Sequence, residues 1–191
     1  MASRMALIIV DMLKSFFQPS EKIPVSENLY KVADNIKILI DECHRRGVPV
    51  IYSNDAFQPA EVPIDHHFKL HGVHAVKGTS GAEVYDLIAP TEKDFIIEKK
   101  LYDGFYNTRL DSVLRELQVN TVMVTGTWTN CCVMHTVMGA WVRLYQPIVP
   151  VDGVTCPDES DHKWALNYME KYYGARMVNL SEAVDVIRGA K

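Results

Sequence analysis

The chain contains 191 residues, of which 48% are hydrophobic, so it has the length and apolar content of one domain with a sizeable core. Lys and Arg total 20 and Asp and Glu total 24, which leaves a net charge of −4 and argues against a nucleic-acid-binding surface. Four cysteines are too few for a disulfide scaffold. No apolar run approaches the roughly 20 residues of a membrane-spanning helix. We therefore expect a cytoplasmic protein with reduced thiols and with neither a nucleic-acid nor a membrane partner.

Short apolar runs that are typical of β-strands recur along the chain. The first, MALIIV, covers residues 5–10 and ends at Asp11. The other strands that we predict are residues 48–53, 95–99, 121–125, 147–151 and 175–178. Near-continuous apolar strands of this kind indicate a parallel sheet that is buried on both faces.

Helical patterns lie between these strands. The longest covers residues 26–46, carries basic residues in its last turn and stops at Gly47. Ser80 and Glu83 have capping-box spacing and predict a short helix through residue 88. Further helices are predicted from Thr108, over 131–145, over 159–172 and from Ser181. The alternation predicts a three-layer α/β/α, Rossmann-like fold with a mostly parallel six-stranded sheet, in a single domain over residues 1–191.

Chemically useful side chains follow four of the predicted strands. In parallel α/β sheets, functional groups gather beyond the carboxyl ends of the strands. These positions hold Asp11 after the first strand, Asn54 and Asp55 after the second, Lys99 and Lys100 at the third, and the turn 126–132 after the fourth. The sequence therefore predicts that an acid, a base and a thiol meet at one sheet edge.

Cys132 is the candidate nucleophile, since it lies in the first turn of a predicted helix. The positive end of a helix dipole favours a thiolate. The alternatives are that Cys132 is a small buried apolar residue or that the adjacent Cys131 faces the site, and spacing alone does not choose between them.

Asp11 and Lys99 are the candidate acid–base groups. A buried aspartate at a strand end is costly unless it is paired or used, although it could also cap a turn. Lys99 could hold Asp11 ionised, although a surface lysine is the simpler interpretation of that position alone.

Four short motifs stand in order along the chain: LIIVDMLKSF (7–16), GTSGA (78–82), KKLYDGFYNT (99–108) and GTWTNCCV (126–133). In these motifs the chain resembles the isochorismatase-like cysteine hydrolase superfamily, which includes N-carbamoylsarcosine amidases and nicotinamidases. The resemblance runs over nearly the whole chain. It is specific for the superfamily and not for a substrate.

The resemblance implies the roles of individual residues. It selects Cys132 over Cys131 as the nucleophile, and Lys99 over Lys100 as the lysine that accompanies Asp11. It also implies a cis peptide before Trp128 and an oxyanion hole made by the backbone N–H groups of Trp128 and Cys132.

Two departures from the superfamily pattern affect the predicted pocket. Leu13-Lys14-Ser15 replaces the usual Gln-Asn-Asp, and Trp128 stands where a small residue is common. We predict that Phe16, Tyr102 and Trp128 line a tight aromatic substrate pocket. The alternative for Trp128 is that it packs into the core or into a subunit interface.

The metal motif of nicotinamidases is incomplete here. Similar proteins have Asp-x-His after the second strand and a later His before the Gly-Thr motif. Here the first element reads Asp55-Ala56-Phe57, while His74 matches the later histidine and His66, His67 and His71 lie in the same loop. Zinc or another divalent ion on Asp55, His67 and His74 would have suitable ligands, but the broken motif favours ordinary loop histidines. We expect that no cofactor is required. The incomplete metal motif also makes nicotinamide a less favoured candidate for the substrate.

We therefore expect a hydrolase that cleaves a non-peptide, amide-type C–N bond in a small carbamoyl, ureido or carboxamide substrate, through an acyl-enzyme on Cys132. The alternatives are an isochorismatase-type vinyl-ether hydrolase, a nicotinamidase, or a non-catalytic interaction module. The resemblance implies a homo-oligomer, a dimer or a tetramer. Trp141 and Tyr145 are candidates for its interface or, alternatively, for the core.

Overall fold

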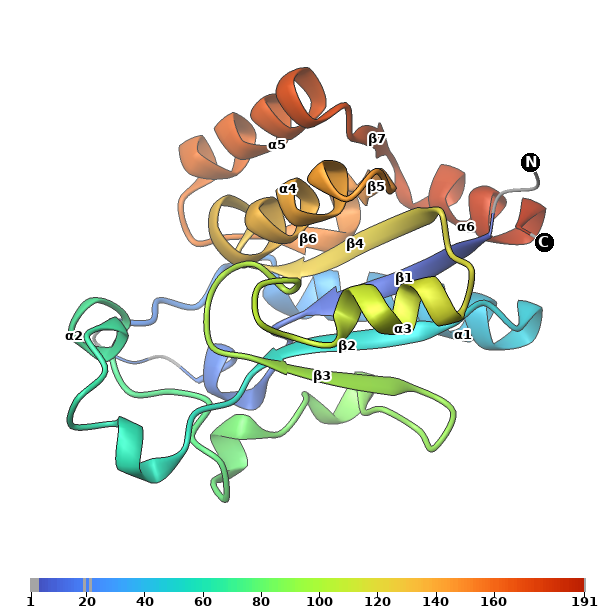
Figure 1. Cartoon of the computed structure of the whole chain (residues 1–191). Coiled ribbons are helices and arrows are strands. Elements are labelled where there is room, and N and C mark those ends of the chain that lie inside the picture. Colours follow the sequence, from blue (N-terminus) through green and yellow to red (C-terminus); the bar gives the residue numbers. More distant parts are fainter. Residues whose placement is uncertain (1–3, 19, 21, 191) are drawn as a thin grey trace.

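A parallel sheet runs through the centre of the computed structural model, which describes residues 4–18, 20 and 22–190 (Figure 1). All of its strand pairs are parallel, and its order is β3-β2-β1-β4-β5-β7, with β6 paired to β4. The strands are β1 (Met5–Val10), β2 (Val50–Asp55), β3 (Phe95–Lys99), β4 (Thr121–Thr127), β5 (Gln146–Pro150), β6 (Val154–Thr155) and β7 (Arg176–Val178). The predicted α/β fold and its six strands are confirmed. The described sheet has a seventh strand, β6, which was not predicted because two residues carry no periodic signal.

The helices agree with the prediction in most places. They are α1 (Leu29–Arg46), α2 (His67–His71), α3 (Leu110–Glu116), α4 (Met134–Val142), α5 (Glu159–Tyr173) and α6 (Leu180–Gly189). Gly47 ends α1 in the left-handed conformation, with φ of 68°, and its N–H bonds the carbonyls of Cys43 and His44, as expected of a helix stop. The five-residue α2 was not predicted, because it is too short to show a helical period.

Two predicted helices were wrong in detail. The segment 80–88 forms two separate 3₁₀ turns, Ser80–Ala82 and Asp86–Ile88, and the N-cap of the first is Thr79, whose side chain makes no capping bond. Val84, between the turns, forms a β-bridge with Leu13, which keeps the chain extended there. The helix predicted over 131–145 starts earlier, as a π-helical turn over Thr129–Val133, and then continues as α4.

The helices cover the sheet in two layers, and each layer encloses its own core. Alternate β1 side chains point to opposite faces, as the period of a strand requires. Leu7 and Ile9 pack with α1 and α6, whereas Ile8 and Val10 pack with α3, α4 and α5. Since both faces of β1 are apolar and fully buried, the charged groups at its carboxyl end emerge from a rigid base.

No helix in the described ranges is long and apolar enough to cross a membrane.

Candidate active site

The carboxyl ends of three adjacent strands bring the predicted acid and base together. Asp55 and Lys99 are the last residues of β2 and β3 and are paired in the ladder. Asp11 follows β1, and its N–H bonds the carbonyl of Ser53 at 3.1 Å. Asp55 and Lys99 lie 44 and 88 positions after Asp11 in the sequence, and the register of the sheet makes the three residues neighbours.

Gly126 allows this corner to close. It lies opposite Val10 in the β1–β4 ladder and has φ of +112°. A Cβ at this position would stand 2.0 Å from the Val10 carbonyl oxygen. Only glycine permits this approach, so β4 can deliver the following turn directly beside Asp11.

Lys99 bridges two carboxylates. Its ammonium donates to Asp11 Oδ2 and to Asp55 Oδ1, both at 2.6 Å. Its nitrogen also lies 3.6 Å from the sulfur of Cys132. The Asp55 N–H donates to the other oxygen of Asp11 at 2.7 Å, so the orientation of the Asp11 carboxylate is set from two sides. Lys100, the alternative lysine, instead forms an ion pair with Glu61 at the surface.

Cys132 lies in the π-helical turn that begins after Trp128. The Trp128 carbonyl accepts the N–H groups of Cys131 and Val133. The sulfur of Cys132 lies beside the two carboxylates: Asp11, Asp55 and Cys132 offer atoms that all lie within 4.8 Å of one another. The expected cis peptide between Thr127 and Trp128 is present. The structure thus brings the three predicted catalytic side chains together.

The buried charges change each other's pKa values. Burial, and then the negative charge of Asp55, raise the pKa of Asp11 to about 6 although Lys99 opposes them. Burial alone would also raise the pKa of Asp55, but the Lys99 ammonium and a His74 hydrogen bond outweigh it and lower that pKa to about 2. The two carboxylates outweigh the burial of Lys99, so the pKa of the ammonium stays well above its usual value. A carboxyl group with a pKa of about 6 is suited to both accepting and donating a proton near neutral pH.

Burial, and then the Asp11 carboxylate, raise the pKa of the Cys132 thiol well above its usual value, and Lys99 only partly compensates. The prediction that the helix terminus favours a thiolate was therefore wrong for the resting site. Desolvation outweighs the helix dipole because Cys132 is 6% exposed. A neutral thiol must give its proton to a nearby base before the sulfur can attack, and the Asp11 carboxylate lies within reach to accept it.

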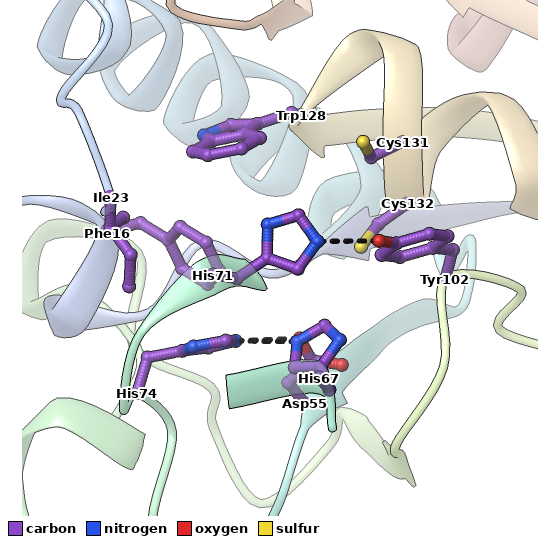
Figure 2. Close-up of a pocket in the computed structure, with 10 residues that line it drawn as sticks. All are labelled: Phe16, Ile23, Asp55, His67, His71, His74, Tyr102, Trp128, Cys131 and Cys132. Carbon is purple, nitrogen blue, oxygen red and sulfur yellow. Dashed lines mark hydrogen bonds and ion pairs between the residues drawn. The ribbon is translucent and has the colours of Figure 1, made fainter. Parts of the chain in front are cut away.

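A cavity opens beside Cys132 (Figure 2), and the empty space in and in front of it, including space open to solvent, is about 340 Å³. It is lined by Phe16, Ile23, Asp55, His67, His71, His74, Tyr102, Trp128, Cys131 and Cys132. All three predicted pocket residues are among these. Trp128 lines the cavity, with its ring centroid 6.2 Å from that of Phe16, and it also packs against the core as a half-buried side chain.

A hydrogen bond closes one wall of the cavity. Nε2 of His71, at the end of α2, lies 2.6 Å from the Tyr102 hydroxyl. Figure 2 shows the two side chains meeting beside Cys132, and the His71 ring lies between Trp128 and His67. Burial lowers the pKa of His71 and lowers that of His67 to about 4, so both imidazoles are neutral at pH 7.

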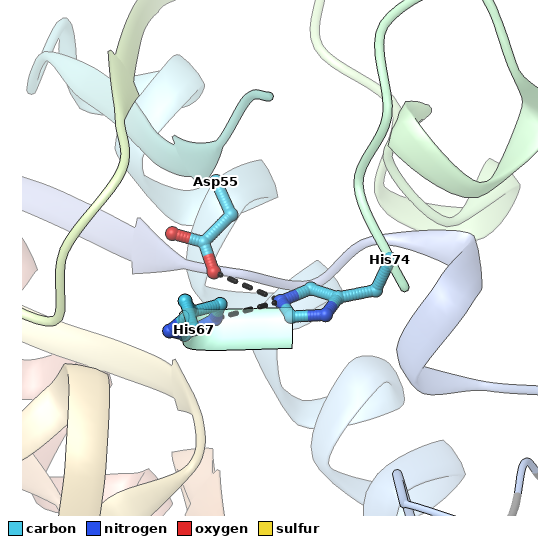
Figure 3. A group of neighbouring side chains, drawn as sticks. All are labelled: Asp55, His67 and His74. Carbon is cyan, nitrogen blue, oxygen red and sulfur yellow. Dashed lines mark hydrogen bonds and ion pairs between the residues drawn. The ribbon is translucent and has the colours of Figure 1, made fainter. Parts of the chain in front are cut away.

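Asp55, His67 and His74 form the donor set that could hold a metal ion (Figure 3). Nε2 of His74 lies 3.3 Å from Nε2 of His67 and 3.5 Å from Asp55 Oδ2, and its Nδ1 donates to the Gly72 carbonyl at 2.8 Å. One carboxylate oxygen and two imidazole nitrogens, one of them oriented by a backbone carbonyl, suit a divalent ion. His66 lies outside the set and is largely exposed.

The sequence analysis assigned Asp55 only as a possible metal ligand and missed that it is the second partner of Lys99. Its position at the exit of the second strand was the available signal. His71 was a loop histidine without an assigned partner, because no local pattern links it to Tyr102. Tyr145, a candidate for a subunit interface, is 3% exposed and belongs to the core, whereas Trp141 is 47% exposed.

The chain is similar in sequence to a known family of proteins. The model of the isochorismatase domain family matches residues 5–182. An uncharacterized isochorismatase family protein of Bacillus subtilis, YaaI, is 27% identical over 181 residues, which cover 94% of this chain and 96% of that protein.

Two solved structures extend the comparison. The crystal structure of N-carbamoylsarcosine amidase from Thermoplasma acidophilum aligns with a TM-score of 0.82 and 32% identity, over 93% of this chain and 96% of that one. A pyrazinamidase/nicotinamidase from Streptococcus mutans aligns with a TM-score of 0.83 and 28% identity, over 91% and 99%. The chain belongs to the isochorismatase family.

Proposed function

We propose that the protein is a cysteine amidohydrolase that hydrolyses a non-peptide, amide-type C–N bond in a small molecule, with Asp11, Lys99 and Cys132 as its catalytic triad. One observation carries the proposal: the Lys99 ammonium lies 2.6 Å from Asp11 and 3.6 Å from the sulfur of Cys132, which lines a cavity. Relatives named N-carbamoylsarcosine amidase and nicotinamidase support the same reaction type.

In the first half of the reaction, Asp11 accepts the thiol proton as the Cys132 sulfur attacks the substrate carbonyl carbon. The carbonyl electrons move to oxygen, and the N–H groups of Trp128 and Cys132 stabilise this oxyanion by about 3 kcal/mol per donor. When the intermediate collapses, the C–N bond breaks and the leaving nitrogen takes the proton from Asp11. The Lys99 ammonium stabilises the ionised form of Asp11 before the proton is accepted and after it has been donated.

In the second half, Asp11 deprotonates a water molecule, which attacks the thioester carbon. The C–S bond then breaks, the acid leaves, and Cys132 recovers its proton. The net reaction consumes one amide and one water and releases an acid and ammonia or an amine.

The proton transfers need no cofactor, and we propose that none is required. A divalent ion on Asp55, His67 and His74 would supply Lewis-acid polarisation of a substrate atom. Activity that survives exhaustive chelation supports the cofactor-free reaction, and activity that is lost on chelation and restored by zinc contradicts it.

The test of the function is a panel of carboxamides, ureas and carbamoyl amino acids, assayed for ammonia release with wild-type protein. We expect release from at least one carboxamide. Pyruvate release from isochorismate, with no ammonia from any amide, would instead support the vinyl-ether hydrolase. No turnover of any panel member or of isochorismate would support a non-catalytic interaction module.

We also propose a cytoplasmic homo-oligomer. All four cysteines are free, as is usual in a reducing compartment. Trp141 on α4 and Trp164 and Tyr172 on α5 are 47%, 53% and 53% exposed, which is unusual for side chains that face only water. Light scattering on a sizing column should report a dimer or tetramer that Trp164→Glu weakens, and a monomeric wild-type protein would contradict the proposal.

A further inference from the structure

The turn that carries Cys132 is held from outside by one later segment of the chain, residues 154–162. The turn consists of Trp128 and the π-helical residues Thr129–Val133. The later segment comprises β6 and the first turn of α5. It contacts the chain directly before Trp128 and directly after it, so it brackets a residue whose N–H is proposed to stabilise the oxyanion.

The contacts before Trp128 come from β6. Gly126 and Thr127, at the end of β4, are paired in register with Val154 and Thr155. The Thr127 hydroxyl also donates to the Thr155 carbonyl at 3.1 Å. Because Thr127 is fully buried, losing this bond would leave a polar group without a partner, which is costly. The chain that leads into Trp128 is therefore fixed by β6.

The contacts after Trp128 come from α5. Oγ1 of Thr129 and Nδ1 of His162 are hydrogen-bonded at 2.9 Å, and Asn130 Nδ2 donates to Asp161 Oδ2 at 3.0 Å. Two successive residues of the turn are thus bonded to two successive residues of α5. Thr129 is fully buried, whereas the bond to Asp161 lies at the surface. Water can replace an exposed partner more readily than a buried one, so we expect the His162 bond to constrain the turn more strongly.

The first turn of α5 is itself well anchored. The Asp158 carboxylate accepts the N–H groups of Ser160 and Asp161 at 2.8 and 2.9 Å. The His162 N–H donates to the Asp158 carbonyl at 3.0 Å. A capped first turn resists fraying, so His162 stands on a fixed support.

The turn needs such a support because of what it is proposed to do. π-helical turns are rare in proteins. Within this one, the Trp128 carbonyl accepts the N–H groups of both Cys131 and Val133. N–H groups stabilise an oxyanion only when they are oriented before the reaction, and a displacement of about 1 Å can cost about 10²-fold in rate. A side chain that holds the turn can therefore control the rate without touching the substrate.

We propose that His162 is a positioning residue, whose hydrogen bond to Thr129 fixes the turn that carries the oxyanion-stabilising N–H groups. His162 is not among the described residues that line the cavity, so it acts through the turn and not through the substrate. The catalytic consequence rests on the proposed amidohydrolase function, whereas the effect of His162 on the order of the turn does not depend on it.

The kinetic test uses His162→Ala and an amide that the wild-type protein hydrolyses. We expect kcat to fall by about 10- to 100-fold, while KM changes by less than about threefold because the cavity is untouched. His162→Asn places an amide group where Nδ1 stood and should restore most of kcat. An unchanged kcat in His162→Ala, or a loss that His162→Asn does not restore, would overturn the inference.

His44→Ala is the matched control. The His44 side chain bonds Asp94 at 2.7 Å, directly before β3 and therefore at the amino ends of the strands, away from the turn. We expect this variant to keep the kcat of the wild-type protein. An equal loss of kcat in His44→Ala and His162→Ala would mean that removing any bonded histidine has the same effect, and would also overturn the inference.

Hydrogen–deuterium exchange tests the order of the turn without a substrate. In His162→Ala we expect the backbone amides of residues 126–133 to exchange at least about tenfold faster than in the wild-type protein, while those of β1 do not change. Unchanged exchange over 126–133 would overturn the inference. If His162→Ala loses its fold, exchange rises in β1 as well, and Thr129→Val then removes the same bond while it keeps the shape of the side chain.

Alkylation of Cys132 separates this inference from the proposed function. In the Cys131→Ala background, iodoacetamide forms an S–C bond with loss of iodide, the thiol proton passes to Asp11, and no oxyanion develops. We therefore expect His162→Ala to change the labelling rate by less than about threefold. A loss of labelling as large as the loss of turnover would place the effect at the thiol and overturn the assignment. A wild-type protein that hydrolyses no amide would contradict the proposed function, and the exchange measurement then decides the role of His162 by itself.

Discussion

The two walls of the candidate active site are built in different ways. Asp11, Asp55 and Lys99 stand on the ends of parallel strands and compensate one another's charges within a fully buried network. The facing wall comes from α2, with His67 and His71, and from the loop after β3, with Tyr102, and side-chain hydrogen bonds hold it. The register of a sheet is rigid, whereas loops vary readily. The comparison suggests that the strand ends determine reactivity and that the loops determine which substrate enters.

The largest expected effect concerns Cys132, in the turn that lies beside the strand-end wall. Cys132→Ala removes the nucleophile, and we expect turnover of an identified amide to fall by about 10⁴-fold or more, as for other covalent nucleophiles. Steady-state ammonia release measures it. Cys131→Ala, the matched control, should retain turnover of the same order as wild type. The reverse pattern would assign the reaction to the neighbouring thiol.

The second prediction concerns pH. Because the pKa of Asp11 is about 6, the carboxyl group is increasingly protonated below that value and cannot accept the thiol proton. We expect kcat/KM to fall as the pH drops through 6, and Asp11→Asn to cost about 10²–10⁴-fold in turnover and to abolish this limb. A profile that stays flat between pH 7 and pH 4.5 would remove Asp11 as the base.

The third prediction tests charge compensation in the same wall. Lys99→Met leaves two buried carboxylates without their ammonium, so we expect the free energy of unfolding to fall by about 3–5 kcal/mol. Urea titration followed by circular dichroism measures it. Lys100→Met removes only the surface pair with Glu61, and we expect a change below about 1 kcal/mol. Similar losses in the free energy of unfolding in both variants would mean that the buried ion pairs of Lys99 contribute no more to stability than the surface pair of Lys100.

The smallest expected effect concerns the loop wall. Tyr102→Phe removes the hydroxyl that bonds His71, a contact worth about 0.5–1.5 kcal/mol. We expect KM to change by up to about tenfold while kcat changes less, because the triad is untouched. Tyr106→Phe, at a side chain that is 60% exposed, serves as the control. A large loss of kcat in Tyr102→Phe would show that the two walls are not independent.

The order of strands and helices could be read from the sequence because it depends on local periodicity. MALIIV predicted β1, and the alternation of apolar strands with helices predicted a sheet buried on both faces. Short elements were not predicted, because the two residues of β6 and the five of α2 are too few to show a hydrophobic period. Ser80 and Glu83 were misleading because a β-bridge between Leu13 and Val84 outweighs the local capping tendency.

The sequence also determined which residue types stand near the strand ends, since Asp11, Asp55 and Lys99 follow or end predicted strands and Cys132 begins a predicted helix. The tertiary structure decided how they share charge. The pairing of β2 with β3 gives Lys99 a second carboxylate, and burial leaves Cys132 protonated rather than ionised. It likewise decided that His71 meets Tyr102 in one wall of the cavity. Pairing, burial and desolvation depend on residues that are far apart in the chain, and these properties exist only once the strands and loops are packed together.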